Sequence, residues 1–144
     1  MAIEGKLIGL EGFKSKLKRI DGAVNRGAKM EMGKLIAEMH EEVVTTISRG
    51  GRSGRVYGNH QASAPGEAPK TDTGELVASM RPSVLSTKRH IEGTISADAK
   101  HAAPLEFKPA SRGGRPFMRP LYKRWRRRIT KRLEHNIMVY VRRV

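Results

Sequence analysis

Histidines and carboxylates are the side chains of this sequence best suited to hold a metal ion or to move a proton. The five histidines are His40, His60, His90, His101 and His135. No two of them stand in the H-x-x-x-H or H-E-x-x-H pattern that places zinc ligands on one face of a helix. The chain has no cysteine, which removes thiolate ligands and disulfides. We therefore expect neither a metal site nor a cofactor.

Paired carboxylates are the other candidate chemistry, because they can share general acid and base roles. The candidates are Glu67, Asp72, Glu75, Glu92, Asp98 and Glu106. Each is explained more simply as a helix cap, a turn residue or a surface residue. The sequence contains no Gly-x-Ser-x-Gly elbow, and residues 51–54 lack the Gly-Lys that completes a phosphate-binding loop. The sequence therefore predicts a protein that is not an enzyme.

Positive charge is the strongest chemical feature of the chain. Between Arg119 and Arg143 ten lysines and arginines stand against one acid, Glu134, which leaves +9 of a total net charge of +15. Such a segment needs either full hydration or a negative neighbour. The basic face that we expect there consists of Arg124, Arg126, Arg127, Arg128, Lys131 and Arg132. Duplex phosphates and an acidic protein surface are both open as its partner.

Periodic apolar residues predict the helices that carry these groups. At 144 residues we expect one domain, 1–144. Residues 10–20 are predicted to form a short helix that Asp21-Gly22 breaks, with Asp21 capping the next helix. Residues 23–49 form a long amphipathic helix that contributes the core anchors Leu35 and Met39 and ends at Gly50-Gly51. Residues 3–10 are predicted to form a short strand.

The second half alternates short elements with loops. A capping-box variant opens a helix from Asp72 through Met80, with Leu76 in the core, and Pro82 stops it. Residues 83–88 and 90–97 predict a hairpin, and residues 101–107 a turn of helix. After a second loop, 108–116, the last helix begins between residues 116 and 120 and runs to about Tyr140, with Trp125 and Ile129 as core anchors. The predicted fold class is α+β: two long helices packed with a small antiparallel β-sheet.

Residues 50–70 are predicted to form an extended loop with five glycines and two prolines. Such a loop is uncommon without a function. A disordered linker and an arm that orders against a neighbour are both compatible with it. Residues 1–20 lack the apolar core of a signal peptide, and no apolar run approaches the roughly 20 residues needed to cross a bilayer. We therefore expect no membrane partner.

Three ordered segments resemble a family of small tailed-bacteriophage proteins. They are RVYGNHQASAPGEAP (55–69) followed by TDTGEL (71–76) and Ser79, then HAAPLEF (101–107), then RPFMRP (115–120). Together they are similar to the tail-completion or head–tail joining proteins, of the minor tail protein Z-like type. The chain departs from the family pattern at His101, where tyrosine is common, and at Lys108, where glycine is usual.

The resemblance implies a structural virion protein at the head-proximal end of a phage tail. Its members form a ring that matches the six-fold symmetry of the tail and joins it to the head connector. The implied partners are identical subunits, the tail tube or terminator protein and the head connector proteins, with passing contact with double-stranded DNA. The implied location is the virion, and the host cytoplasm during assembly. A tail terminator, a head-closure protein and, from another class, a nonspecific nucleic-acid-binding protein are the alternatives.

For a ring subunit, the loops and the segments beside them are the expected contact regions. The residues expected to touch a neighbouring subunit or partner are Tyr57, His60, Gln61, Pro65, Glu67, Glu106, Phe107, Arg115 and Phe117. Packing within one subunit is an equally good explanation for each of them. The basic face of the last helix would then face either the DNA that passes through the neck or an acidic ring.

Overall fold

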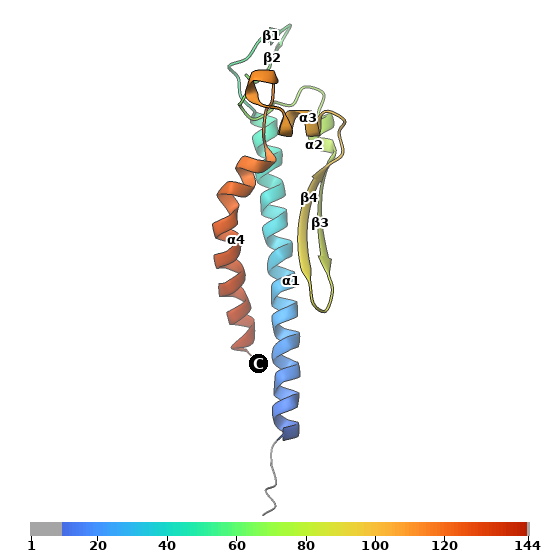
Figure 1. Ribbon diagram of the computed structural model, residues 1–144, viewed down its shortest axis with the longest axis vertical. Coiled ribbons are helices and arrows are strands. Elements are labelled where there is room, and N and C mark those ends of the chain that lie inside the picture. Colours follow the sequence, from blue (N-terminus) through green and yellow to red (C-terminus); the bar gives the residue numbers. More distant parts are fainter. Residues whose placement is uncertain (1–9, 144) are drawn as a thin grey trace, which may run out of the picture.

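The computed structural model describes residues 10–143, which form an elongated molecule in which α4 and a β-hairpin lie along α1 (Figure 1). The elements are α1 (Leu10–Arg49), β1 (Val56–Tyr57), β2 (His60–Gln61), α2 (Glu75–Ala78), β3 (Met80–Ser86), β4 (Ile91–Ala97), α3 (Ala102–Phe107), η1 (Ala110–Arg112) and α4 (Met118–Val141). The predicted α+β fold class is confirmed. The strand expected at 3–10 lies outside the described residues, except that Leu10 begins α1.

A single helix, α1, stands where the sequence predicts two. Residues 10–49 are helical without interruption, so the break expected at Asp21-Gly22 is wrong. A glycine inside a helix costs only about 1 kcal/mol relative to alanine, which a long packed helix tolerates. Asp21 does not cap a helix, because it lies inside α1 and no helix begins there. Its carbonyl accepts a hydrogen bond from Asn25 Nδ2 one turn later (3.0 Å). The predicted end of the helix is confirmed at Gly50, whose φ of 49° suits glycine.

The core lies where α1 meets α4 and the hairpin. Its buried side chains include Leu35, Met39, Val43 and Ile47 of α1, Leu76 and Met80, and Phe117, Leu121 and Trp125 at the start of α4. Four of the five predicted core anchors are therefore buried, and Ile129 packs partly buried beside them. Burial of this apolar surface is what holds the two long helices together.

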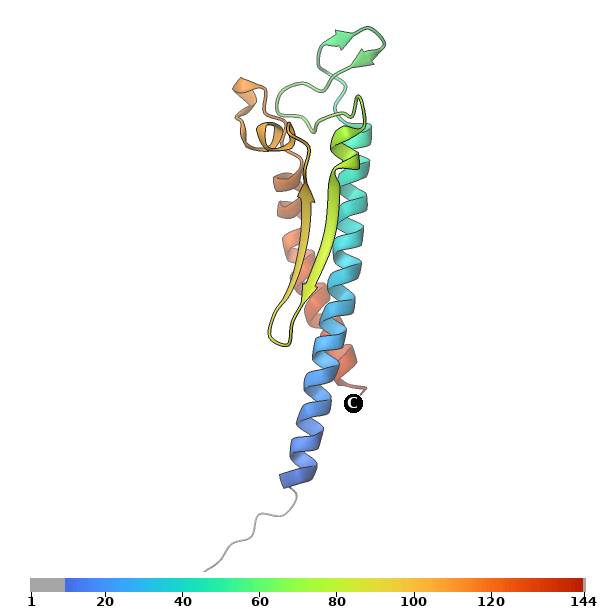
Figure 2. The same cartoon turned by 90° about the vertical axis from the view of Figure 1, so that its right-hand side faces the viewer.

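The β3–β4 hairpin covers a second side of α1 (Figure 2). The strands pair antiparallel from Met80↔Ala97 to Ser86↔Ile91, which confirms the predicted hairpin. The strand begins earlier than expected, at Met80, and Pro82 lies inside it rather than ending a helix. Because β3 is an edge strand, proline is tolerated there. Gly93 brings β4 close to α1, since a Cβ atom there would overlap the side chain of Ile36.

The short helix before the hairpin starts later than the sequence predicts. The residue that precedes α2 is Gly74, with φ of 81°, and Thr73 Oγ1 accepts a 3.4 Å hydrogen bond from the Glu75 N–H. The capping role expected for Asp72 is therefore wrong. Its carboxylate instead lies 3.7 Å from Nδ1 of His60.

The long loop between α1 and α2 folds back on the chain. Backbone hydrogen bonds join Gly51 to Ala68 (3.2 Å) and Gly54 to Ala62 (3.0 Å), so the loop closes on itself. The small β1–β2 hairpin projects from it at the top of the molecule (Figure 1). Residues 50–70 therefore fold back on themselves, with β1 and β2 as a small antiparallel hairpin within the loop.

The predicted helix at 101–107 and the predicted start of the last helix are confirmed by α3 and α4. The loop between them contains the short turn η1. Neither long helix in the described part of the chain has a stretch apolar enough to cross a membrane.

Candidate assembly surfaces

Glu106 fixes the entry to α4. Its buried carboxylate accepts hydrogen bonds from the backbone N–H groups of Phe117 (2.8 Å), Met118 (2.9 Å) and Arg119 (2.9 Å). The Arg119 side chain adds a bond from Nε (3.0 Å). The Glu106 carboxylate thus accepts from the free N–H donors of the first turn, which the residue before α4, Phe117, does not cap with its own side chain. Although burial opposes ionisation, the hydrogen bonds hold the pKa of Glu106 below its usual range.

Arg115 joins the second loop to the first. Its Nε and Nη2 atoms donate to the carbonyl of Ser63 (3.1 and 2.9 Å), and its backbone N–H donates to the carbonyl of Leu105 (2.7 Å). Gly66 donates to the carbonyl of Gly114 (2.8 Å). The three segments that carry the family resemblance thus meet at one end of the molecule and hydrogen-bond to one another.

Glu67 is also used within the chain. It accepts hydrogen bonds from the Ser53 hydroxyl and from the Ala64 N–H (2.9 Å), and these bonds lower its pKa, with Ser53 contributing most. Of the residues expected at a partner interface, Glu106 and Phe117 are buried and Arg115 is half-buried. For Glu106 and Phe117 the expectation of outward contact needs correction, because their side chains build the α3–α4 corner.

Other expected contact residues do face outward. The Tyr57 side chain is 59% exposed and that of Phe107 is 72% exposed. Each carries an arginine nearby: the guanidinium of Arg55 lies 5.4 Å from the Tyr57 ring centre, and that of Arg119 lies 5.7 Å from the Phe107 ring centre. Pro65 is exposed, and His60 and Gln61 are half-buried in β2.

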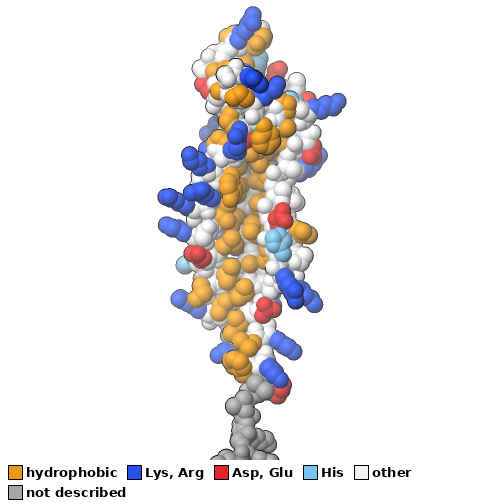
Figure 3. Space-filling model, in the orientation of Figure 1, with side chains coloured by type: hydrophobic (Ala, Val, Ile, Leu, Met, Phe, Trp, Pro, Cys, Tyr) orange, Lys and Arg blue, Asp and Glu red, His pale blue; other side chains and the backbone are white. Residues whose placement is uncertain are grey.

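An apolar groove runs between α4 and β4, with α1 as its floor. We call it the α4–β4 groove; it encloses about 470 Å³ and is lined by Ile36, Met39, Gly93, Thr94, Ile95, Met118, Arg119, Leu121 and Tyr122. A smaller hollow continues it upward beside Ala97, Ala102 and Phe107. Figure 3 shows hydrophobic side chains in a band along this face, with basic side chains on its α4 side. Within residues 10–143 no other segment covers the groove.

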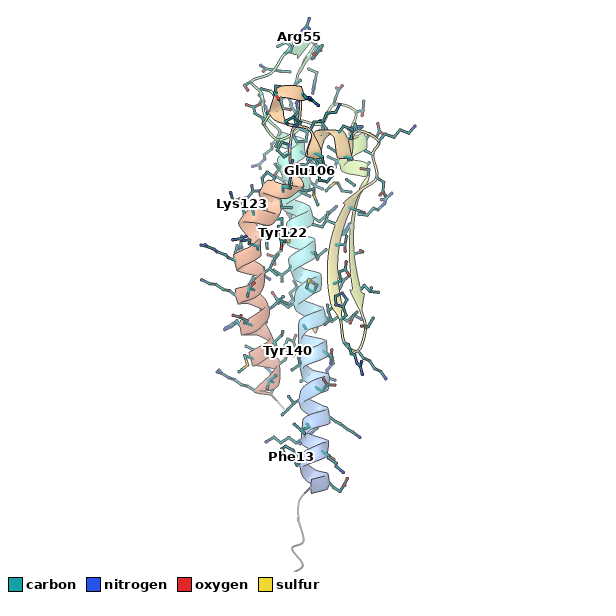
Figure 4. All side chains as sticks on the ribbon, in the orientation of Figure 1. Phe13, Arg55, Glu106, Tyr122, Lys123 and Tyr140 are labelled. Carbon is teal, nitrogen blue, oxygen red and sulfur yellow. The ribbon has the colours of Figure 1, made fainter. Side chains whose placement is uncertain are left out.

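Sequence reasoning missed the α4–β4 groove. Tyr122 lies beside the apolar stripe of the last helix, one residue after Leu121, which was a signal that the apolar side of this helix is wider than the core alone requires. Tyr122 is 61% exposed. In Figure 4 it points toward the groove side of α4, while its neighbour Lys123 points to the outer side.

The basic face is smaller than the sequence predicts, because two of its members pair with α1. Arg124 binds Glu42 (2.7 Å), and Arg132 binds both Glu31 (2.7 Å) and Glu38 (2.5 Å). Glu31 is buried, so Arg132 compensates a charge that would otherwise be costly. The expectation that Arg124 and Arg132 serve a partner is therefore corrected: they fasten α4 to α1.

These ion pairs also shift the pKa values of the groups involved. The hydrogen bond from Arg132 lowers the pKa of Glu38, and the bond to Glu38 raises the pKa of Arg132. Burial opposes ionisation of Glu42, but hydrogen bonds from Arg124 and from Trp125 Nε1 (2.6 Å) keep its pKa below the usual range. Trp125 is thus both a core anchor and a donor between the two helices.

The remaining basic residues of this face stay open. Arg126, Arg127 and Lys131 are exposed and form no ion pair with any residue in the described chain. Arg128 stacks over the Trp125 ring, with its guanidinium 4.4 Å from the ring centre. Arg126, Arg127 and Lys131 therefore constitute the part of the predicted basic face that is available to an anion or an acidic partner.

The histidines and carboxylates of residues 10–143 do not gather into a metal-binding cluster. The described residues contain no group of three or more histidine, aspartate or glutamate side chains placed to hold a metal ion. The His90–Glu92 pair (3.2 Å) lies exposed at the hairpin end.

Comparisons of the chain with family models, with curated proteins and with solved structures find no match. The family resemblance therefore depends on the three sequence segments.

Proposed function

We propose that the chain is a structural subunit of a phage or prophage virion, at the head-proximal end of the tail. In this proposal identical subunits form a ring that completes the tail and joins it to the head connector. The observation that supports it most directly is the α4–β4 groove, an apolar channel that a monomer leaves exposed to water. Apolar grooves of this kind typically mark protein-interaction sites.

The placement of the resembling segments adds support. Three segments that are far apart in the sequence, residues 55–79, 101–107 and 115–120, lie together at one end of the rod. Hydrogen bonds from Arg115 to Ser63 and from Phe117 to Glu106 join them. The three segments build one corner of the fold, which gives a structural reason for their presence together in this chain. This end of the molecule presents Tyr57 of β1 and Phe107 of α3 to solvent as anchors for a neighbouring protein.

Assembly can be tested with one interface variant and a matched control. Native mass spectrometry and electron microscopy of the purified protein, alone and mixed with tails, should show rings. Tyr122→Glu places a charge in the α4–β4 groove and should abolish rings while leaving the helical circular dichroism unchanged. Leu85→Glu is the control, because Leu85 is equally exposed (60%) on the outer face of the hairpin. A protein that stays monomeric in the presence of tails contradicts the proposal.

Neighbouring roles in the same neck are separated by position. A tail terminator or a head-closure protein would also form rings, so a reconstructed particle must place this subunit between the tail tube and the head connector. Density at another level of the neck would favour one of these two alternatives.

A nonspecific nucleic-acid-binding protein is the second candidate function. The exposed and unpaired Arg126, Arg127 and Lys131, within the part of the chain that the structure describes, favour it. Tight binding to random duplex DNA by a protein that never assembles, with an affinity that falls steeply with salt, would support this function over the ring subunit.

A further inference from the structure

A pocket with basic walls lies at the end of the molecule opposite the α3–α4 corner. Lys18, Arg19, Gly22 and Arg26 of α1 and Arg143 after α4 line it, and it encloses about 470 Å³. Lys18, Gly22 and Arg26 follow one another at four-residue steps and so share one side of the helix. Gly22 places no side chain between its two basic neighbours, which leaves the hollow.

The basic side chains of this pocket have no acidic counterpart. No acidic residue lines it, and none of its four cations forms an ion pair within residues 10–143. Residues 10–29 and 135–143 contain eight lysines and arginines against two acids, Glu11 and Asp21. Like charges one helical turn apart repel each other, and a bound anion removes that repulsion.

We propose that this pocket binds a phosphate of the duplex DNA backbone. Arginine presents forked N–H donors that match phosphate oxygens, and three arginines converge here. An acidic protein partner is a poorer fit, because no apolar side chain lines the pocket and protein interfaces depend on such anchors. No aromatic ring lines it either, so bases have nothing to stack on and the contact is with the backbone, independent of sequence.

The contact deepens the proposed function by naming DNA as the partner of one end of the subunit. It does not require the ring, because α1 and Arg143 of a single chain form the pocket. The apolar residues Phe13 and Leu17 lie on roughly the opposite side of α1 from Lys18 and Arg26, by the 100° step of a helix. A protein neighbour and DNA therefore have separate surfaces at this end.

The test compares two double variants in the full chain. Arg19→Gln with Arg26→Gln removes two charges from the pocket, and Arg81→Gln with Lys88→Gln removes two exposed charges from the hairpin. Fluorescence anisotropy with a labelled random duplex of about 30 base pairs, over a salt series, gives the slope of log affinity against log salt. Because the pocket is proposed to hold one phosphate, the pocket variant should lower the slope by about 0.9, and the hairpin variant should leave it unchanged.

Several outcomes overturn the inference. An equal loss in both double variants shows that only total charge matters, and failure of the wild-type protein to bind the duplex removes the basis of the inference. Inorganic phosphate and poly-glutamate are measured as competitors. If the pocket variant loses poly-glutamate binding as strongly as it loses DNA binding, the pocket is a general anion site and not a DNA contact. The same conclusion follows if the pocket binds inorganic phosphate but does not bind the duplex.

Assembly is measured on the same samples, so that the two proposals fail separately. Rings that form normally in the pocket variant, together with unchanged DNA binding, overturn the DNA contact and leave the ring intact. A chain that never assembles but loses its salt slope only when Arg19 and Arg26 are changed overturns the ring and leaves the DNA contact. Circular dichroism and thermal unfolding of each variant confirm that it folds.

Discussion

The two ends of this molecule treat their charged and apolar side chains in opposite ways. At the α3–α4 corner Glu106 is buried and receives four hydrogen bonds from residues 117–119. At the other end the helical side chains of Phe13 and Leu17 are 60% and 48% exposed, and Lys18 and Arg26 have no acidic partner within residues 10–143. Figure 4 marks both ends with Glu106 and Phe13.

The difference shows which parts of the chain fold for themselves. Polar groups that are buried and paired stabilise the chain that contains them, whereas apolar and basic side chains left in water gain most from a partner. The middle of the rod follows the pattern of the corner, since Arg132 and Arg124 hold α4 on Glu31 and Glu42. Below Glu31 no ion pair joins α1 to α4 within residues 10–143, although Gly27 still packs against the Tyr140 ring, so the open pattern begins below Gly27.

Trp125→Ala is expected to give the largest effect. The ring is only 3% exposed, and its removal should lower the free energy of unfolding by about 3–5 kcal/mol. The matched truncation at the open end, Phe13→Ala, should change it by less than about 0.5 kcal/mol in the monomer. Urea denaturation of both variants at a concentration below assembly gives the comparison. Equal losses would mean that Phe13 is covered within the chain.

Glu106→Gln is expected to give the next largest effect. Glutamine keeps the shape of the side chain but loses its charge. It offers one acceptor oxygen to donors that in the wild-type protein share the two oxygens of the carboxylate. We therefore expect the free energy of unfolding to fall by about 2–3 kcal/mol. Because the folded pKa of Glu106 is lowered, its contribution is fully present above the pKa of an unfolded carboxyl, about 4.3. It is lost as the pH falls through the folded pKa.

The pH dependence of stability tests whether the charge of Glu106 causes the loss expected for Glu106→Gln. The difference in stability between wild type and Glu106→Gln should be constant near neutral pH and should shrink below about pH 4. Glu11→Gln is the matched change at the open end, where Glu11 forms only an exposed pair with Lys14 (3.2 Å); it should have little effect at any pH. A Glu106→Gln deficit that persists unchanged in acid would show that the charge is not what holds the corner.

Apolar periodicity predicted the main elements because it records burial. Leu35 and Met39 of α1 are buried one helical turn apart, as are Leu121 and Trp125 of α4, and the alternation of residues 91–97 marks β4. The fold class followed from these patterns. The exact starts of α2 and β3 did not. Pairing with β4 overrides the local preference of Pro82. Asp72 lies against His60 rather than at the start of α2, a contact between residues twelve apart that the local pattern does not show.

The surfaces were less predictable than the elements. A sequence shows that Arg132 is basic, but only the packing of α4 on α1 shows that Glu31 and Glu38 occupy it. In the same way Glu106 and Phe117 read as an acid and an apolar anchor, and the contact between residues eleven apart that buries both is set by the chain path through η1. The α4–β4 groove arises between elements that are distant in sequence, so no single stretch encodes it.

The smallest expected effect on stability comes from replacing two glycines of α1 by alanine, one at the open end and one in the packed part of the rod. A Cβ atom at Gly22 would meet only the end of the flexible Arg26 side chain, at 3.3 Å, whereas a Cβ atom at Gly27 would overlap the Tyr140 ring of α4. Gly22→Ala should therefore stabilise the chain by about 0.5–1 kcal/mol, because alanine favours the helix. Gly27→Ala should destabilise it, because the Tyr140 ring must move.

Urea denaturation and far-ultraviolet circular dichroism of the two alanine variants measure these effects. Stabilisation by Gly22→Ala requires that the helix run unbroken through residues 21 and 22. If the turn that local sequence suggests were present at Asp21-Gly22, alanine would instead strain it, and stability would fall without a gain in helical signal. A loss at Gly22 as large as that at Gly27 would also contradict the contrast, since it would mean that the lower end of α1 is as tightly packed as the stretch that carries α4.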